Sequence, residues 1–323
     1  MYSQILTPLD GSEVSERVLP FARSLAGGLS LPMTLLYAIE PELLTIPRTL
    51  NPSLHVHEMV AHRLRQARGY ADPLATHLRN EGLAVQVEVP QREPAEAIVE
   101  EAGKDEGTLI TMSSHGRSGL ARWWMGSVTD KVLHLTNNPL LVIHSTSGQQ
   151  AAAESSFQRM TVPVDGSELA ESILPHAVYL SAAMNLAIDL VQVNPSRDDY
   201  YRSLSVGPSE VARVTPSYEE YIHIVDAEAE EYLAELKGRL TQQGAASVET
   251  HLMHGPPADT IADLAASTPN NLVAMTTHGR SGVGRMVLGS VAERVVRQSG
   301  DPVLLVRGTR SRQAPLTGAL ATS

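Results

Sequence analysis

The sequence predicts an α/β protein built from two tandem, doubly wound domains, each a parallel sheet flanked by helices. Short apolar runs alternate with segments of helical periodicity, the pattern of a sheet covered on both faces. The same order of segments occurs twice in the 323 residues, a length sufficient for two hydrophobic cores. A His-Gly-Arg-Ser-Gly loop that begins at His115 returns at His278, and each copy is followed at the same distance by Gly-Ser-Val.

The composition excludes several classes of protein. Asp and Glu (36) outnumber Lys and Arg (25), which argues against a broad nucleic-acid surface. The chain has no cysteine, so disulfides, thiolate metal sites and cysteine nucleophiles are excluded. The first residues lack the pattern of a signal peptide, and no apolar run reaches the roughly 20 residues that span a bilayer. These features predict a cytoplasmic protein without nucleic-acid or membrane partners.

The first half begins with an apolar strand that ends in Asp10-Gly11-Ser12-Glu13, followed by apolar residues at helical spacing. The expected elements are a strand at 4–10, a helix at 13–28, a strand at 32–39, a proline-rich loop at 41–54, a helix at 56–80, a strand at 83–89, a helix at 94–102 and strands at 108–112 and 139–143. Pro73 is expected to interrupt the long helix, because proline removes a helical hydrogen bond.

The second half repeats this order. Its first strand ends in Asp165-Gly166-Ser167-Glu168, its second covers 187–193, and its last covers 302–306. The offset between the halves grows from 155 at the first strand to 163 at the glycine loop, and we assign the eight extra residues to a loop within 195–217. The predicted boundaries are a domain at 1–145, a linker at 146–157, a domain at 158–308 and a flexible tail at 309–323.

The two glycine loops have the composition of an anion-binding turn. Gly116 and Gly279 lie where a strand must turn abruptly, and glycine permits positive φ and close approach of a ligand. Ser127 and Ser290 are expected to be helix N-caps, each with a carboxylate three residues further on, as in a capping box. The free N–H groups of such a helix suit a phosphate. A tight turn with a good cap and no ligand is the alternative.

Taken together, the Asp-Gly-Ser-Glu strand ends, the His-Gly-Arg-Ser-Gly loops, the Gly-Ser-Val helix starts and the final apolar strands resemble the universal stress protein family. The chain looks like a tandem member, with two such domains in one polypeptide. The resemblance implies a five-stranded parallel sheet of order 3-2-1-4-5 in each half. Many members of this family bind ATP, so the resemblance also implies a site for an adenine nucleotide.

The family's nucleotide motif is Gly, two residues, Gly, nine residues, Gly, then Ser or Thr. By resemblance, Asp10 and Asp165 would contact the adenosine, and Ala38 and Val193 would meet adenine through backbone groups. The implied site residues are Asp10, Ala38, Ser113, Gly116, Gly126, Ser127 and Val128 in the first half, and Asp165, Val193, Thr276, Gly279, Gly289, Ser290 and Val291 in the second. The chain departs from the motif at its first glycine, where Ser113 and Thr276 stand.

Two classes of function follow. The first is a non-enzymatic stress regulator that binds ATP, ADP or AMP, with Mg²⁺ accompanying the nucleotide. The second is a nucleotide-free interaction module of the same fold, which the two departures from the motif favour. No Gly-Lys-Ser/Thr or Gly-x-Ser-x-Gly motif supports an enzyme, so at most weak ATP hydrolysis is expected. Asp10 and Asp165 could also serve only as turn residues, since Asp-Gly favours turns.

Three further expectations concern partners and ligands. The apolar final strands, 139–143 and 302–306, are expected to pair and join the halves as an intramolecular pseudo-dimer, with a homodimer as a further possibility. His55, His57 and His62 could hold a metal, but histidines before a helix are more often solvated, and no metal site is predicted. The second half is expected to bind nucleotide more tightly, because Gly255 stands where the first half has Arg92.

Overall fold

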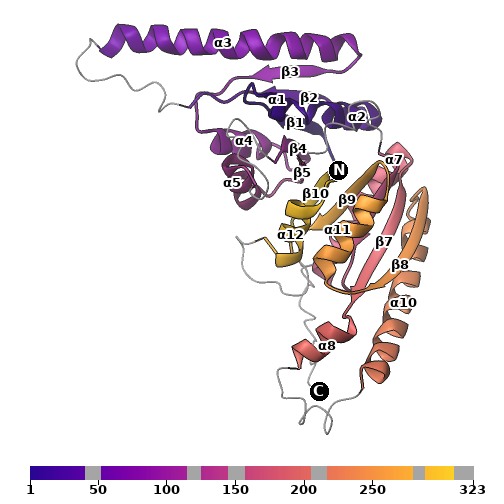
Figure 1. Cartoon of the computed structure of the whole chain (residues 1–323). Helices are drawn as coiled ribbons and strands as arrows, with labels where there is room; N and C mark the ends of the chain where they lie inside the picture. Colours follow the sequence, from indigo (N-terminus) through magenta and orange to yellow (C-terminus); the bar gives the residue numbers. More distant parts are fainter. Residues whose placement is uncertain (41–51, 115–124, 145–156, 205–216, 279–287, 309–323) are drawn as a thin grey trace, which may run out of the picture.

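The strands of the two halves form one continuous sheet. The computed structural model describes residues 1–40, 52–114, 125–144, 157–204, 217–278 and 288–308. Its ten strands have the order β3-β2-β1-β4-β5-β10-β9-β6-β7-β8 (Figure 1). Each half therefore has the order 3-2-1-4-5 that the resemblance implies. Neighbouring strands are parallel within each half, and the two halves meet in an antiparallel pair, β5 with β10.

The first half contains five strands and five helices among the described residues. They are β1 (Gln4–Pro8), α1 (Glu13–Glu16), α2 (Leu19–Leu29), β2 (Met33–Leu36), α3 (Pro52–Asn80), β3 (Val85–Glu88), α4 (Pro94–Ala102), β4 (Thr108–Ser113), α5 (Ser127–Leu135) and β5 (Leu140–Ile143). The single helix expected over 13–28 is two helices, and α2 restarts with a proline in its first turn, where no N–H is needed. The predicted interruption of the long helix at Pro73 is wrong, because α3 continues through it.

The second half repeats these elements. They are β6 (Arg159–Pro163), α6 (Glu168–Glu171), α7 (Leu174–Met184), β7 (Ala187–Asn194), α8 (Arg197–Ser203), α10 (Tyr218–Gln242), β8 (Ser247–His254), α11 (Pro257–Ser267), β9 (Asn271–Thr276), α12 (Ser290–Gln298) and β10 (Val303–Val306). The extra segment is not wholly a loop. A capping box between Ser196 and Asp199 starts α8, and Tyr200 is buried.

Helices cover both faces of the sheet, and both hydrophobic cores run across the two halves. One core contains buried side chains of α2, α3, α7 and α10, and the other contains those of α4, α5, α11 and α12. At the junction Leu141 lies opposite Leu304, and both side chains are 1% exposed. The predicted pairing of the two final strands is therefore confirmed, and it removes an apolar sheet edge from each half.

Aromatic side chains connect the halves beside this junction in two places: Tyr2 contacts His176 and Tyr179, and Phe21 contacts Phe157. The Tyr2 hydroxyl and Nδ1 of His176 share a hydrogen bond of 2.9 Å. Burial lowers the pKa of His176 to about 4, so the ring is neutral at pH 7 and can accept this bond. The second pair is apolar, with the rings of Phe21 and Phe157 at 5.7 Å between centroids.

The residue before the proline of the last strand differs between the halves. In the first half, Nδ2 of Asn138 donates to the carbonyl oxygens of Ala102, Asp105 and Thr108 at 3.1, 2.9 and 3.3 Å. The corresponding residue in the second half is Asp301, which has no amide to donate. Burial raises the pKa of Asp301 to about 6 against a lowering effect of the Asn271 side chain, and its Oδ2 is buried without a hydrogen-bond partner among the residues that the structure describes.

We expect Asp301→Asn to stabilise the protein by about 1–2 kcal/mol at pH 7.5, a value discounted for partial exposure of the carboxyl group. Because its folded pKa is raised, Asp301 destabilises the protein above pH 6, and this penalty fades as the pH falls from about 6 to 4. Urea unfolding at pH 7.5 and pH 5 measures both effects. Asp263→Asn, at an exposed position of α11, is the control. Equal stability of the wild type and Asp301→Asn at pH 7.5 would contradict the prediction.

Candidate functional site

A cavity of about 380 Å³ lies at the carboxyl ends of β1, β2 and β4, with α3 on its far side. Ligands of doubly wound folds bind at this position. The first-half candidates that the structure describes all line it: Asp10, Ala38, Ser113, Gly126, Ser127 and Val128. Gly116 lies outside the described residues. The strand order thus brings together residues that are far apart in the sequence.

Asp10 has a structural role as well as a place on the cavity wall. Its Oδ1 accepts hydrogen bonds from the backbone N–H and the hydroxyl of Ser12, at 3.0 and 2.6 Å. This Asx turn needs the positive φ of Gly11, +82°. Asp165 makes the same two bonds to Ser167 in the second half. Both aspartates therefore act as turn residues, and Asp10 also lines the cavity.

The helix starts after the glycine loops lie one residue earlier than expected. Gly126 and Gly289 are the N-caps, and Ser127 and Ser290 are the first helical residues, so the predicted serine capping boxes are wrong. Glycine has no side chain with which to cap, and neither helix has a side-chain hydrogen bond at its N-cap. The N–H groups in the first turn of α5 remain available to an anion at the cavity wall.

Ser113 replaces the first glycine of the family motif without filling the cavity. It is 7% exposed and forms part of the wall, and its carbonyl oxygen accepts a hydrogen bond from the hydroxyl of Thr129 over 2.9 Å. The equivalent Thr276 donates to the carbonyl oxygen of His278 over 2.7 Å. A Cβ at this position is therefore compatible with an open first-half cavity.

The second-half candidates occupy the corresponding positions. Asp165 follows β6, Val193 lies near the end of β7, Thr276 ends β9, and Gly289, Ser290 and Val291 lie at the start of α12. Gly279 lies outside the described residues. The topology thus places these residues at the carboxyl edge of the second half of the sheet, as it does in the first half.

The far wall of the first cavity comes from α3 and was not anticipated. Arg63, Gln66 and Ala67 line it, and Arg63 has no ion-pair partner among the residues that the structure describes. Their i, i+3, i+4 spacing places them on one helix face, but nothing in the sequence shows that this face overlies the strand ends. Arg63 adds one positive charge to a lining that also carries the carboxylates of Asp10 and Glu40, in a chain whose formal net charge is −11.

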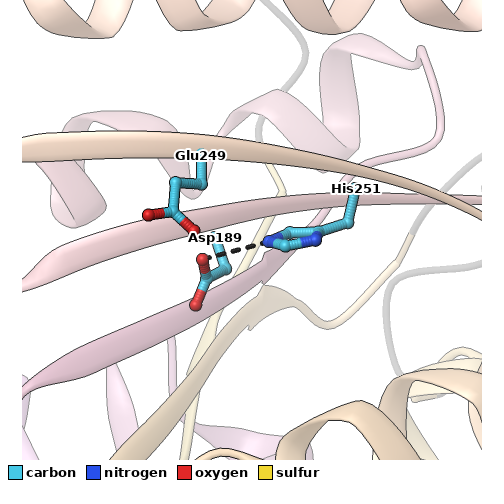
Figure 2. Close-up of side chains that lie close together, drawn as sticks. All are labelled: Asp189, Glu249 and His251. Carbon is cyan, nitrogen blue, oxygen red and sulfur yellow. Dashed lines mark hydrogen bonds and ion pairs between the residues drawn. The ribbon is translucent and has the colours of Figure 1, made fainter.

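A second cluster of polar side chains lies on the strands of the second half, away from the predicted site. Oxygen and nitrogen atoms of Asp189, Glu249 and His251 all lie within 4.8 Å of one another (Figure 2). Arg159, however, bonds both carboxylates: its Nε lies 2.8 Å from Asp189 and its Nη2 lies 2.8 Å from Glu249. A guanidinium thus occupies the position where a cation would bind, and the cluster is an ion-pair network.

His62 lies exposed on α3, and the side chains of His55 and His57 lie outside the described residues. Cross-strand neighbours such as Asp189 and Glu249 cannot be paired from the sequence without the strand register. His62 is not part of the cluster on β7 and β8.

Fold and crevice together define a tandem, doubly wound α/β protein that presents a cavity at the carboxyl ends of its strands. The model of the universal stress protein family matches residues 1–144 and 156–307. The chain belongs to the universal stress protein family. A universal stress protein of Mycolicibacterium smegmatis is 26% identical over 310 residues, which cover 94% of this chain and 96% of that protein. One of Mycobacterium bovis is 25% identical over 311 residues, with the same coverage.

Solved structures support the fold along nearly the whole chain. A universal stress protein from Archaeoglobus fulgidus has a TM-score of 0.66 at 20% identity, covering 94% of this chain and 98% of its own. A putative universal stress protein from Pseudomonas aeruginosa has a TM-score of 0.62 at 17% identity, covering 95% of this chain and 94% of its own. In the part of the chain that the structure describes, every helix is too short or too polar to cross a membrane.

Proposed function

We propose that the chain binds an adenine nucleotide in the cavity of its first half and acts as a non-enzymatic stress regulator whose nucleotide state is read by partner proteins. The observation that carries the proposal is the cavity itself, which brings Asp10, Ala38 and Ser127 onto one wall. Its volume of about 380 Å³ falls in the usual range for ligand pockets.

The base end of the cavity offers one backbone donor and one acceptor. The N–H groups of Tyr37 and Ile39 donate to the carbonyl oxygens of Glu88, the last residue of β3, and of Pro90. The carbonyl oxygen of Leu36 accepts from the N–H of Leu9, the residue after β1. Backbone groups alternate along a strand, so the N–H and C=O of Ala38 point to the β1 side. The chain turns away there at Asp10, and no described backbone group bonds to Ala38. The edge of adenine, with an acceptor and a donor side by side, complements this pair.

The phosphate end is the start of α5. The N–H groups that follow Gly126 and the positive end of the helix dipole favour an anion. Arg63 on the opposite wall adds a positive charge. A Mg²⁺ ion that accompanies the nucleotide would neutralise phosphate charge.

Ser127→Asp is expected to weaken ATP binding at least about tenfold, because it places a negative charge at the phosphate end. Aspartate in the first turn suits the helix dipole, so the fold should be retained. Calorimetric titration with ATP measures the loss, after denatured protein has been checked for co-purified nucleotide. Thr76→Asp is the matched control, since it adds the same charge at an exposed position of α3, about 14 Å along the helix from Ala67, the cavity residue nearest to it. Unchanged affinity in Ser127→Asp would contradict the assigned phosphate end. A wild type that neither retains nor binds adenine nucleotide would favour the interaction-module alternative.

A further inference from the structure

The two crevices are alike at the helix end and different at the strand end. The glycine N-caps of α5 and α12 correspond, and so do the Asx turns that follow β1 and β6. Where the second strand of each half ends, the residues differ in chemistry. Tyr37 and Ile39, on the wall of the first cavity, correspond to Gln192 and Asn194.

Asn194, Asp226 and His254 link the strand ends of the second half to α10. Asn194 is 4% exposed, and its Nδ2 donates to Oδ1 of Asp226 over 2.8 Å. Nε2 of His254 lies 3.0 Å from both carboxylate oxygens of Asp226. One carboxylate on α10 therefore holds the last residues of β7 and β8. We refer to these three residues as the strap.

Contacts with the extra segment reinforce the strap. The hydroxyl of Tyr218 donates to the carbonyl oxygen of Pro195 over 3.2 Å, and the rings of Tyr200 and Tyr221 stack at 4.7 Å. The chain that leaves β7 is thus fastened to the first turns of α10 (Figure 1).

The first half has no counterpart of the strap among its described residues. Tyr70 bonds Glu16 as Tyr232 bonds Glu171, which aligns α3 with α10. In this alignment Leu64 corresponds to Asp226. An apolar Leu64 cannot bond the strand ends, and Ile39, which corresponds to Asn194, cannot bond it in return.

The sequence-based reason for tighter binding in the second half does not hold. Arg92 is exposed, pairs with Glu100 and is absent from the wall of the first cavity, so it does not occlude that crevice. In the second half, Gly255 adopts φ +141°, which serves the turn between β8 and α11.

We propose that the strap closes the base end of the second crevice, so that each chain holds one nucleotide, in its first half. This inference rests on the proposed function for its ligand. The closure of the crevice by the strap can be tested without any ligand.

Thiol labelling tests the closure directly, because the natural chain contains no cysteine. Gln192 is 7% exposed, and its Nε2 donates to Oδ1 of Asn194 in the strap over 3.3 Å, so Gln192→Cys should react slowly with an aromatic disulfide reagent. Adding Asp226→Ala should raise the rate at least about tenfold, since it removes hydrogen bonds to a charged acceptor. Glu230→Ala, at an exposed position one turn further along α10, is the matched control and should leave the rate unchanged. Equal rates with and without Asp226→Ala would overturn the strap.

Titration with ATP then counts the sites. We expect one site per chain in the wild type, lost in Ser127→Asp and retained in Ser290→Asp. Two sites per chain, or loss of the site in Ser290→Asp, would overturn the inference while leaving nucleotide binding itself established. If no nucleotide binds, the proposed function fails, and the labelling experiment still decides whether the strap closes the crevice.

Discussion

Leu141→Asp is expected to abolish cooperative folding of the full chain or to lower its stability by about 5 kcal/mol. Leu141 is 1% exposed in the strand pair that joins the halves, opposite Leu304. A carboxylate there would be buried in a shared apolar core, with no cation described beside it. Guanidinium unfolding followed by circular dichroism measures the change.

The control for this variant is Leu135→Asp. Leu135 is 42% exposed at the end of α5, so the same substitution should cost no more than about 1 kcal/mol. If the unfolding midpoint of Leu141→Asp stayed within error of the wild type, the continuous sheet would be wrong as a description of the protein in solution.

Arg159→Met is expected to destabilise the protein by about 2–3 kcal/mol. It would leave the carboxylate of Asp189, whose side chain is 5% exposed, without its guanidinium partner. The figure lies below that for a fully buried pair because the Arg159 side chain is 33% exposed. Lys104→Met, which removes a partner of Glu101 at a mostly exposed position, should change stability by less than about 1 kcal/mol.

The same network sets a pH dependence. Burial acts to raise the pKa of Asp189, but the hydrogen bonds from Arg159 and His251 outweigh it and hold the pKa below its usual range. A depressed folded pKa stabilises the protein at neutral pH, and this contribution is lost as the pH falls through that value. Arg159→Met should therefore lose less stability on acidification than the wild type. Stabilisation of the wild type by Zn²⁺ would instead show that the cluster takes a metal.

The sequence was most informative where the signal is local or repeated. Apolar runs located the strands, and the Asp-Gly-Ser turns follow from the need for positive φ at Gly11 and Gly166. The predicted break at Pro73 was wrong because packing along α3 outweighs one missing hydrogen bond. Ala71 and Ala75, on either side of the proline, are 1% and 0% exposed. The serine caps were misplaced by one residue, since a glycine cap leaves no side-chain signal.

Contacts between residues far apart in the chain could not be predicted from the sequence. The Asp189–Glu249 neighbourhood depends on the register between β7 and β8, and the strap depends on how α10 lies over the ends of both strands. Arg63 faces the first cavity for the same reason, the placement of a long helix over a sheet edge. None of these contacts produces a pattern along the chain that could be recognised beforehand.

Because the two halves belong to one chain, the two sides of their interface need not be identical, as they must be in a symmetric dimer. In a dimer of identical subunits, the two aromatic pairs across the junction would be copies of each other, and every substitution would appear twice. Here Tyr2 stands where the second half has Phe157, and Phe21 stands where it has His176. One pair is hydrogen-bonded and the other is apolar. Each half thus recognises the other as a distinct partner, and covalent linkage keeps that partner at a high local concentration even when the protein is dilute.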